Sequence, residues 1–229
     1  MTHISSNFIR GGQSNSVALD EPRKANIYRS FGKRTFDLLL CIILAPIALP
    51  VIAVLALWVR KDGGGAFFTQ DRVGRGGHHF KCLKLRTMRV DAEAHLVEMC
   101  RVDPEIRKEW ELYQKLDNDP RITRVGNILR KTSLDELPQF LNVLFGDMSF
   151  FGPRPFLPSQ GALYMGAGGK AYFDMRPGIS GSWQVSARNE STFVERVEYD
   201  EDYFRDLSLL TDLKLLWQTF VVVIKRKGK

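Results

Sequence analysis

FDLLLCIILAPIALPVIAVLALWV, residues Phe36–Val59, is the stretch that decides the fold, because about 24 nearly uninterrupted apolar residues can enter a lipid bilayer as a helix. The single charge in this run, Asp37, lies near its start. A cleaved signal peptide would place its apolar region at the extreme N-terminus, whereas about 35 residues precede this one. The sequence therefore predicts a protein that is anchored to a membrane.

Basic residues flank the apolar run on both sides: Arg29, Lys33, Arg34, Arg60 and Lys61. Positive residues favour the cytoplasmic side of a membrane, and here they favour it at both ends of the run. Pro46 and Pro50 each remove a backbone donor near its midpoint. We therefore expect a re-entrant helical hairpin over residues 31–61 that breaks at one of these prolines. A tilted straight span is the alternative.

Length and composition limit the number of domains and the kinds of partner that the chain can have. With 229 residues and 44% hydrophobic content, we expect a mobile N-terminal tail over residues 1–30, the membrane hairpin over 31–61 and one cytosolic catalytic domain over 62–229. The net charge of +7 indicates an anionic partner, which could be nucleic acid, an acidic membrane surface or a phosphorylated substrate. Cys41, Cys82 and Cys100 show neither disulfide nor metal-ligand spacing, as in a reducing compartment.

The domain alternates short strand-like and helical patterns. Residues 66–73 and 78–85 flank the turn GRGG and predict a β-hairpin, with Lys84 and Arg86 on one face. Helical spacing predicts helices over residues 91–100, 104–116, 123–130, 137–146 and 209–220. The predicted fold class is α/β, mixed and helix-rich, with a small β-hairpin or sheet. The last helix has an apolar stripe and a basic end, so it either lies on anionic lipid or packs against the domain.

TSLDELPQF, Thr132–Phe140, sets two carboxylates side by side in this basic chain. In a purely structural interpretation, Ser133 and Glu136 form a capping box and Asp135 complements the dipole of the helix that follows. These residues alone favour that interpretation.

The surrounding segments favour chemistry instead. Arg130 and Lys131 precede the carboxylates, FGPRP follows at residues 151–155, and MRPGISGSWQVSAR covers residues 175–188. Turns rich in glycine and proline can hold guanidinium groups near an anion such as phosphate. Nearby arginines are expected to lower the pKa of Asp135 and leave it ionised, as a nucleophile or a ligand for a hard cation. Mg²⁺ takes one or two protein carboxylates together with phosphate oxygens.

Other templates match poorly. The sequence contains no Walker loop, no His-Glu-x-x-His zinc motif and no G-x-S-x-G elbow. It also contains no helix-turn-helix, zinc-finger or ribonucleoprotein pattern, so nucleic acid is not an expected partner.

The run DPRITRVGNILRKTSLDELPQFLNVLFGDMSFFGPRP, Asp119–Pro155, resembles the signature of the bacterial polyprenyl-phosphate sugar-1-phosphate transferases, also called monotopic phosphoglycosyl transferases. The likeness extends to KRTFD at residues 33–37, KLRTM at 84–88 and RPGISGSWQVSAR at 176–188. It covers nearly everything after residue 30. Family members with one membrane hairpin and one catalytic domain include exopolysaccharide-initiating enzymes of the ExoY type.

The resemblance implies a reaction and two catalytic residues. The sugar 1-phosphate of a UDP-sugar, expected to be a UDP-hexose, would pass to undecaprenyl phosphate with release of UMP. Asp135 would form a covalent phospho-sugar intermediate, and Glu136 would bind Mg²⁺, with Mn²⁺ as an alternative ion.

The resemblance also implies binding roles around the dyad. Arg154 and Arg176 would hold phosphate oxygens, with Lys84 and Arg86 as weaker candidates. The nucleotide would lie near a further group of side chains, Trp183, Gln184 and Arg188. The family bends its membrane helix at a proline, and Pro46 is the preferred match, with Pro50 second.

The family further implies a place and partners. We expect a transferase on the cytoplasmic face of a bacterial inner membrane that initiates exopolysaccharide or related glycan assembly. Its partners would be a UDP-sugar, undecaprenyl phosphate and the phospholipid membrane, and a homodimer is left open. Ser182 and Ala187 replace a bulky residue and a glycine of the family pattern, which affects the nucleotide contacts more than the dyad. A non-catalytic membrane-anchored scaffold is the alternative function.

Overall fold

The structure, a computed structural model, describes residues 27–113, 116–186 and 191–224. Most of the predicted tail, residues 1–26, therefore lies outside the described part of the chain. Helical structure begins slightly before the predicted start of the membrane hairpin, with a π-helical turn over Tyr28–Gly32 that continues into the first α-helix.

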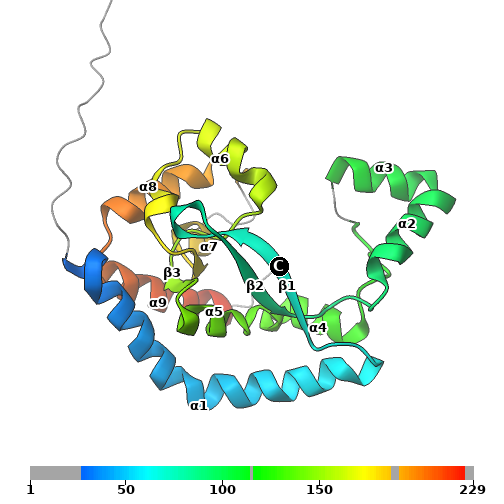
Figure 1. The fold of residues 1–229 in the computed structure, drawn as a ribbon, viewed down its shortest axis with the longest axis horizontal. Coiled ribbons are helices and arrows are strands. Elements are labelled where there is room, and N and C mark those ends of the chain that lie inside the picture. Colours follow the sequence, from blue (N-terminus) through cyan, green and yellow to red (C-terminus); the bar gives the residue numbers. More distant parts are fainter. Residues whose placement is uncertain (1–26, 114–115, 187–190, 225–229) are drawn as a thin grey trace, which may run out of the picture.

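The apolar run forms one long helix, α1, over Lys33–Val59. Its ribbon descends along one side of the molecule and then turns to run beneath the domain (Figure 1). Pro46 and Pro50 lie inside the helix near this midpoint, where each lacks the N–H that would bond one turn back. Along the described chain, the segment Tyr28–Val59 is the one helix long and apolar enough to cross a membrane, and an 18-residue window within it has a mean hydropathy of 3.0.

Two small sheets lie above α1. Strands β1 (Phe67–Val73) and β2 (His79–Leu85) form the predicted antiparallel hairpin, and the GRGG segment forms the turn Arg75–Gly77. Strands β3 (Ser149–Phe151) and β4 (Gly178–Ser180) pair in parallel. A Cβ on Gly178 would lie 2.2 Å from the backbone nitrogen of Gly152, so glycine is required where these two segments meet.

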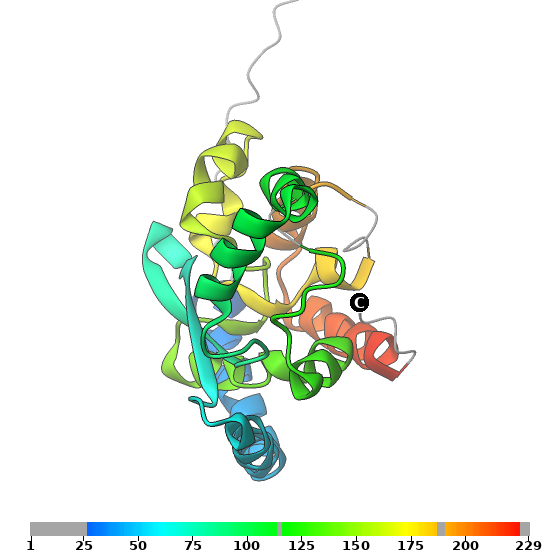
Figure 2. The same cartoon turned by 90° about the vertical axis from the view of Figure 1, so that its right-hand side faces the viewer.

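The remaining elements are helical. The α-helices are α2 (Ala92–Val102), α3 (Pro104–Tyr113), α4 (Arg124–Thr132), α5 (Gln139–Phe145), α6 (Gly161–Gly166), α7 (Ser182–Ser186), α8 (Arg196–Arg205) and α9 (Leu209–Ile224). One-turn 3₁₀ helices cover Arg60–Asp62, Arg75–Gly77, Leu134–Glu136, Pro158–Gln160 and Ala171–Asp174. Helices α2 and α3 project from the body as an arm, which faces the viewer in Figure 2. The helix-rich fold with a small hairpin is confirmed, and the predicted helices agree with the observed ones within a few residues.

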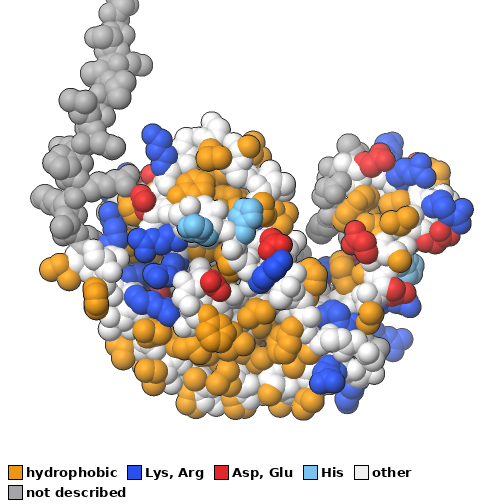
Figure 3. Space-filling view, in the orientation of Figure 1, with side chains coloured by type: hydrophobic (Ala, Val, Ile, Leu, Met, Phe, Trp, Pro, Cys, Tyr) orange, Lys and Arg blue, Asp and Glu red, His pale blue; other side chains and the backbone are white. Residues whose placement is uncertain are grey.

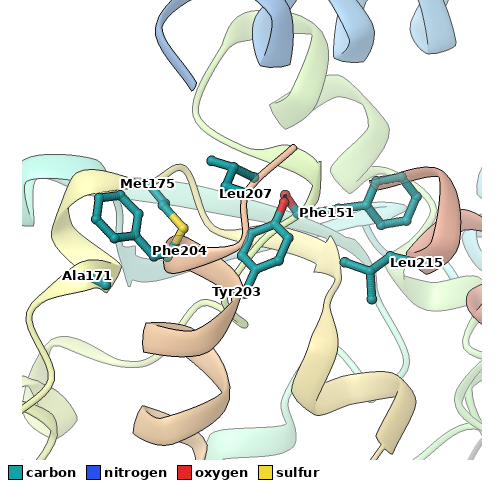
Figure 4. Packing of buried hydrophobic residues seen from close by; sticks show 7 residues of the cluster. All are labelled: Phe151, Ala171, Met175, Tyr203, Phe204, Leu207 and Leu215. Carbon is teal, nitrogen blue, oxygen red and sulfur yellow. Dashed lines mark hydrogen bonds between the residues drawn. The ribbon is translucent and has the colours of Figure 1, made fainter. Parts of the chain in front are cut away.

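The domain core is built from several buried clusters. One of them joins β3, α8 and α9, where Tyr203 lies between Phe204 on one side and Phe151 and Leu215 on the other (Figure 4). Two further clusters include α1 itself. Cys41 and Ile52 pack with Phe140 and Val143 of α5, while Leu55, Ala56 and Val59 pack with Leu85 and Leu129.

Polar contacts also attach the N-terminal end of α1 to the domain. The fully buried carboxylate of Asp212 accepts hydrogen bonds from Tyr28 Oη at 2.6 Å, Lys33 Nζ at 2.7 Å and Tyr203 Oη at 2.7 Å. Asp37, the one charge inside the apolar run, turns inward and accepts from Ser149 Oγ at 2.9 Å. Both halves of α1 therefore rest on the same globular domain.

Candidate active site

The two neighbouring carboxylates lie on a single 3₁₀ turn, Leu134–Glu136, between α4 and α5. Ser133 ends α4 in the left-handed conformation, with φ of 56°, and its side chain makes no capping hydrogen bond to this turn. The capping-box interpretation is therefore wrong, because Ser133 stands at the N-cap of the 3₁₀ turn but its side chain does not cap it. At the start of α4 a side chain does cap the helix, since Thr123 Oγ1 accepts from Gly126 N at 2.9 Å.

Close packing fixes α4 against the segment that follows β2. A Cβ on Gly126 would lie 1.9 Å from the carbonyl oxygen of Thr87, so only glycine permits this approach. Arg130 then reaches the same segment, since its Nε donates to Thr87 Oγ1 at 2.9 Å. This contact holds Arg130 close to the dyad.

Two cations hold Glu136. Its Oε1 accepts from Lys84 Nζ at 2.9 Å and from Arg154 Nη2 at 3.1 Å. Lys84 Nζ also lies 4.0 Å from Asp135 Oδ2, and the side chains of both acids are 14% exposed. The structure therefore brings together four of the predicted residues, Asp135, Glu136, Lys84 and Arg154, and leaves each of their side chains partly exposed.

The pKa of Asp135 departs from the sequence-based prediction. Burial raises the pKa of its carboxyl above the ordinary value, and the charge of Glu136 raises it further, while Lys84 and Arg130 act in the opposite direction. The predicted lowering by arginines is wrong because loss of solvent outweighs the nearby cations. A carboxylate with poor solvation is also a more reactive nucleophile, since less hydration must be removed before it attacks.

A buried chain of contacts behind the dyad was not predicted. Arg196 Nη2 donates to the backbone carbonyl of Arg154, and Arg196 Nε lies 3.4 Å from Asp200 Oδ2. The hydroxyl of Tyr164 donates to the same carboxylate at 2.9 Å. Burial raises the pKa of Asp200 to about 6, against the lowering by Arg196. Arg196 and Asp200 stand four residues apart on α8, which was the one clue in the sequence.

Arg72 is a second residue that the sequence analysis missed. It projects from β1, donates to the carbonyl of Pro155 at 3.2 Å and to Gln70 Oε1 at 2.7 Å, and is electrostatically coupled to Arg154 and Glu136. It therefore adds positive charge beside the loop that carries Arg154.

Two predicted phosphate-binding residues lie elsewhere. The guanidinium of Arg86 donates to the carbonyls of Gly65 at 2.6 Å and Met88 at 2.9 Å, where it holds the chain between β2 and α2. Arg176 Nε donates to the carbonyl of Gly146 at 2.7 Å, at the end of α5. These hydrogen bonds go to main-chain carbonyls and not to the carboxylates of the dyad.

The predicted nucleotide segment is described in part. Trp183 Nε1 donates to Ser191 Oγ at 2.7 Å, and Arg196 lies 5.5 Å from the Trp183 ring centroid. Arg196 therefore contacts both this ring and the backbone of Arg154. Both amide atoms of Gln184 are buried without a hydrogen-bond partner among the described residues. Arg188 lies in residues 187–190, outside the described part of the chain.

The donor atoms of the dyad fit a magnesium ion in their chemistry. Carboxylate oxygens are hard ligands, and Mg²⁺ is commonly held by one or two of them together with water and phosphate oxygens. Across residues 27–113, 116–186 and 191–224 there is no group of three or more His, Cys, Asp or Glu side chains suited to a metal. Glu136, and Asp135 beside it, would therefore hold an ion jointly with a phosphorylated ligand.

Comparison with known proteins defines the class to which this fold and site belong. The family model described as bacterial sugar transferase matches residues 28–226, which is most of the chain. The protein therefore belongs to the bacterial sugar transferase family, and the resemblance derived from the sequence is confirmed.

Individual named relatives are similar to this chain over most of its length. The chain is 41% identical over 221 residues to the exopolysaccharide production protein ExoY of Sinorhizobium fredii, with 94% of this chain and 97% of that protein covered. It is 46% identical to a UDP-galactose-lipid carrier transferase of Erwinia amylovora and 44% identical to an undecaprenyl-phosphate galactose phosphotransferase of Salmonella typhimurium. Each of these two matches covers 86% of this chain, which spans only 41% of the length of either relative.

Proposed function

We propose that the protein transfers a sugar 1-phosphate from a UDP-sugar to undecaprenyl phosphate, at a membrane surface, as a first step of exopolysaccharide assembly. The observation that carries this proposal is the partly buried Asp135–Glu136 dyad with Lys84 and Arg154 on the Glu136 carboxylate. The names of the Erwinia and Salmonella relatives support transfer of galactose phosphate to a lipid carrier. The name of the Sinorhizobium relative supports a role in exopolysaccharide production.

The proposed chemistry has two displacements at one phosphorus atom. An oxygen of Asp135 attacks the phosphorus that bears the sugar, a new P–O bond forms, and the bond to the departing UMP oxygen breaks. A phosphate oxygen of undecaprenyl phosphate then attacks the same phosphorus, and the Asp135 carboxylate leaves unchanged. Lys84, Arg154 and Arg130 stand where they can neutralise charge on the phosphate oxygens as each displacement proceeds.

Glu136 has a different proposed role from its neighbour. Its carboxylate accepts from two cations on Oε1, which fixes its orientation beside Asp135. Glu136 would hold Mg²⁺ together with a phosphorylated ligand, and the bound ion would supply positive charge for the leaving phosphate. The unpaired amide of Gln184 supports a nucleotide nearby, since a buried polar group without a partner is costly unless a ligand or water satisfies it.

The proposed membrane topology is re-entrant. A straight span would carry the two ends of α1 to opposite sides of a bilayer, yet Lys33 is bonded to Asp212 and Val59 packs with Leu85 in the same domain. The outward side chains of α1 are apolar and exposed, among them Ile42, Ile43 and Leu57. This arrangement supports a helix that enters the cytoplasmic leaflet of the bacterial inner membrane and returns.

Incubation of the full chain with a labelled UDP-sugar, without lipid, tests the covalent step. We expect mass spectrometry to find a phospho-sugar group on the peptide that contains Asp135, because the carboxylate is placed to attack before the acceptor arrives. A chelator should suppress the adduct if Mg²⁺ acts at Glu136. An unmodified protein that still transfers sugar phosphate to lipid would exclude the two-step scheme.

Cysteine labelling tests the topology. In a background without the native cysteines, Ser30→Cys and Lys61→Cys, both at exposed positions, should react with a membrane-impermeant maleimide from the same side of inverted vesicles. We expect this result because both positions lie next to the ends of α1, which are bound to the same domain. Labelling from opposite sides would establish a straight span.

A further inference from the structure

A basic pocket lies at the start of α1, at a different place from the dyad. Its lining includes four cationic side chains, Arg29, Lys33, Arg75 and Arg176, and two carboxylates, Asp37 and Asp174. Lys84, Arg154, Asp135 and Glu136 do not line this pocket. The proposed transfer reaction therefore leaves the pocket without a role.

Three segments distant in sequence bring arginines together here. Arg75 lies on the hairpin turn Arg75–Gly77, which packs on the turn Ala171–Asp174. Arg176 follows that turn and donates through Nε to Gly146. Arg34 of α1 reaches the same corner, where its Nη atoms donate to the carbonyls of Val143 at 2.6 Å and Leu144 at 2.9 Å.

Not all of this positive charge is balanced. Lys33 is paired with Asp212, and Arg29 donates to the carbonyl of Phe204 at 2.5 Å. Among the described residues, by contrast, no hydrogen bond or ion pair is formed by Arg75 or by the Nη atoms of Arg176. Burial lowers the pKa of Arg176, and the charges of Arg34 and Arg75 lower it further. Mutual repulsion between guanidinium groups is relieved when an anion binds between them.

The position of the pocket indicates whether this anion is a free ion or part of a membrane lipid. Figure 3 shows lysine and arginine side chains gathered on one side of the molecule, directly above a band of apolar side chains. Exposed apolar residues around the pocket include Ile27 and Phe31 just before α1 and Phe145 at the end of α5. If the apolar band enters a bilayer, the basic pocket lies at the level of the phosphate headgroups.

We propose that the basic pocket binds the headgroup phosphate of an anionic membrane phospholipid, at a site separate from the Asp135–Glu136 dyad. The free Nη atoms of Arg176 and the guanidinium of Arg75 would donate to the phosphate oxygens. The acyl chains would lie along the exposed apolar side chains of the neighbouring helix ends. This inference rests on the proposed membrane association of α1, but it does not depend on the transfer chemistry.

The test is a titration of the detergent-solubilised full chain in the absence of UDP-sugar. The ligands are short-chain phosphatidylglycerol, short-chain phosphatidylcholine, glycerol 3-phosphate and inorganic phosphate. We expect phosphatidylglycerol to bind most tightly, and Arg75→Gln to weaken its binding about five-fold, the effect of one cation near a phosphate surface. Arg75→Glu should weaken it further. Lys81→Gln, the same charge change on the same hairpin but outside the pocket, should have no effect.

The outcomes separate this inference from the proposed function. Unchanged phosphatidylglycerol binding by both Arg75 variants would overturn the site. Inorganic phosphate binding as tightly as phosphatidylglycerol would overturn the lipid as its source. Asp135→Asn should bind phosphatidylglycerol like the unaltered chain, so a failure of the transfer chemistry would leave this result intact.

Discussion

Asp135→Asn should lower sugar phosphate transfer by at least about 10⁴-fold while the protein remains folded, which is the scale of loss when a covalent nucleophile is removed. The amide keeps the shape of the carboxylate but cannot displace UMP. The free energy of unfolding should stay the same or rise, because burial and the charge of Glu136 both disfavour the Asp135 carboxylate. Transfer is measured as labelled sugar phosphate in the lipid fraction, and stability by denaturant unfolding.

The matched control is Asp91→Asn, the same substitution on an exposed side chain at the base of the projecting arm. It should leave transfer and stability near those of the unaltered chain. If Asp135→Asn instead unfolds the protein and retains activity in its folded fraction, Asp135 has a structural role. Retention of more than a few per cent of activity by a stable variant would also contradict the proposal.

Arg196→Met should lower the free energy of unfolding by about 3–5 kcal/mol at pH 7.5, because it leaves the buried carboxylate of Asp200 without its cation. The sign of the pH dependence follows from Asp200. Its pKa in the folded protein is about 6, against an ordinary value of 3.8, so the folded state binds this proton more tightly than the unfolded state does. The stability contribution of Asp200 is therefore full below about pH 4 and falls as the pH rises toward 6. Loss of Arg196 should raise the pKa of Asp200 further, so that the fall becomes larger and continues to higher pH.

A double variant provides the control for that effect. Arg196→Met with Asp200→Asn removes both charges, keeps an acceptor for Tyr164 and should be less destabilised than Arg196→Met alone. The double variant should also lose the pH dependence between about pH 4 and 6. Equal destabilisation of the single and double variants at pH 7.5 would show that the Arg196 contacts with Arg154 and the aromatic rings outweigh the ion pair.

The local elements of this fold were predictable because their patterns are short-range. The hairpin, the five predicted helices and the apolar run follow from the alternation and spacing of apolar residues and from turn residues such as those of GRGG. The parallel pair of β3 and β4 was not predicted, since each strand has three residues and their pairing joins segments about 30 residues apart. The left-handed conformation of Ser133, a non-glycine residue, likewise has no clear mark in the sequence.

The candidate site divides in a similar way. Asp135, Glu136, Lys84 and Arg154 were found from their motifs, and the structure brings them together. Arg86 instead donates to the carbonyls of Gly65 and Met88, contacts that the strand alternation does not reveal. Arg176 donates a hydrogen bond to the carbonyl of Gly146, and no local sequence pattern predicts this contact. The direction of the Asp135 pKa depended on burial, which nearby arginines in the sequence could not reveal.

The carboxylate of Asp212 has a consequence for how the chain is made. It accepts from Tyr28 and Lys33, residues that leave the ribosome about 180 positions earlier. If α1 enters the bilayer as proposed, it does so before its final partner on α9 has been synthesised. Docking of the domain onto α1 is then a late event, in which a helix already in the membrane binds the last helix of its own domain.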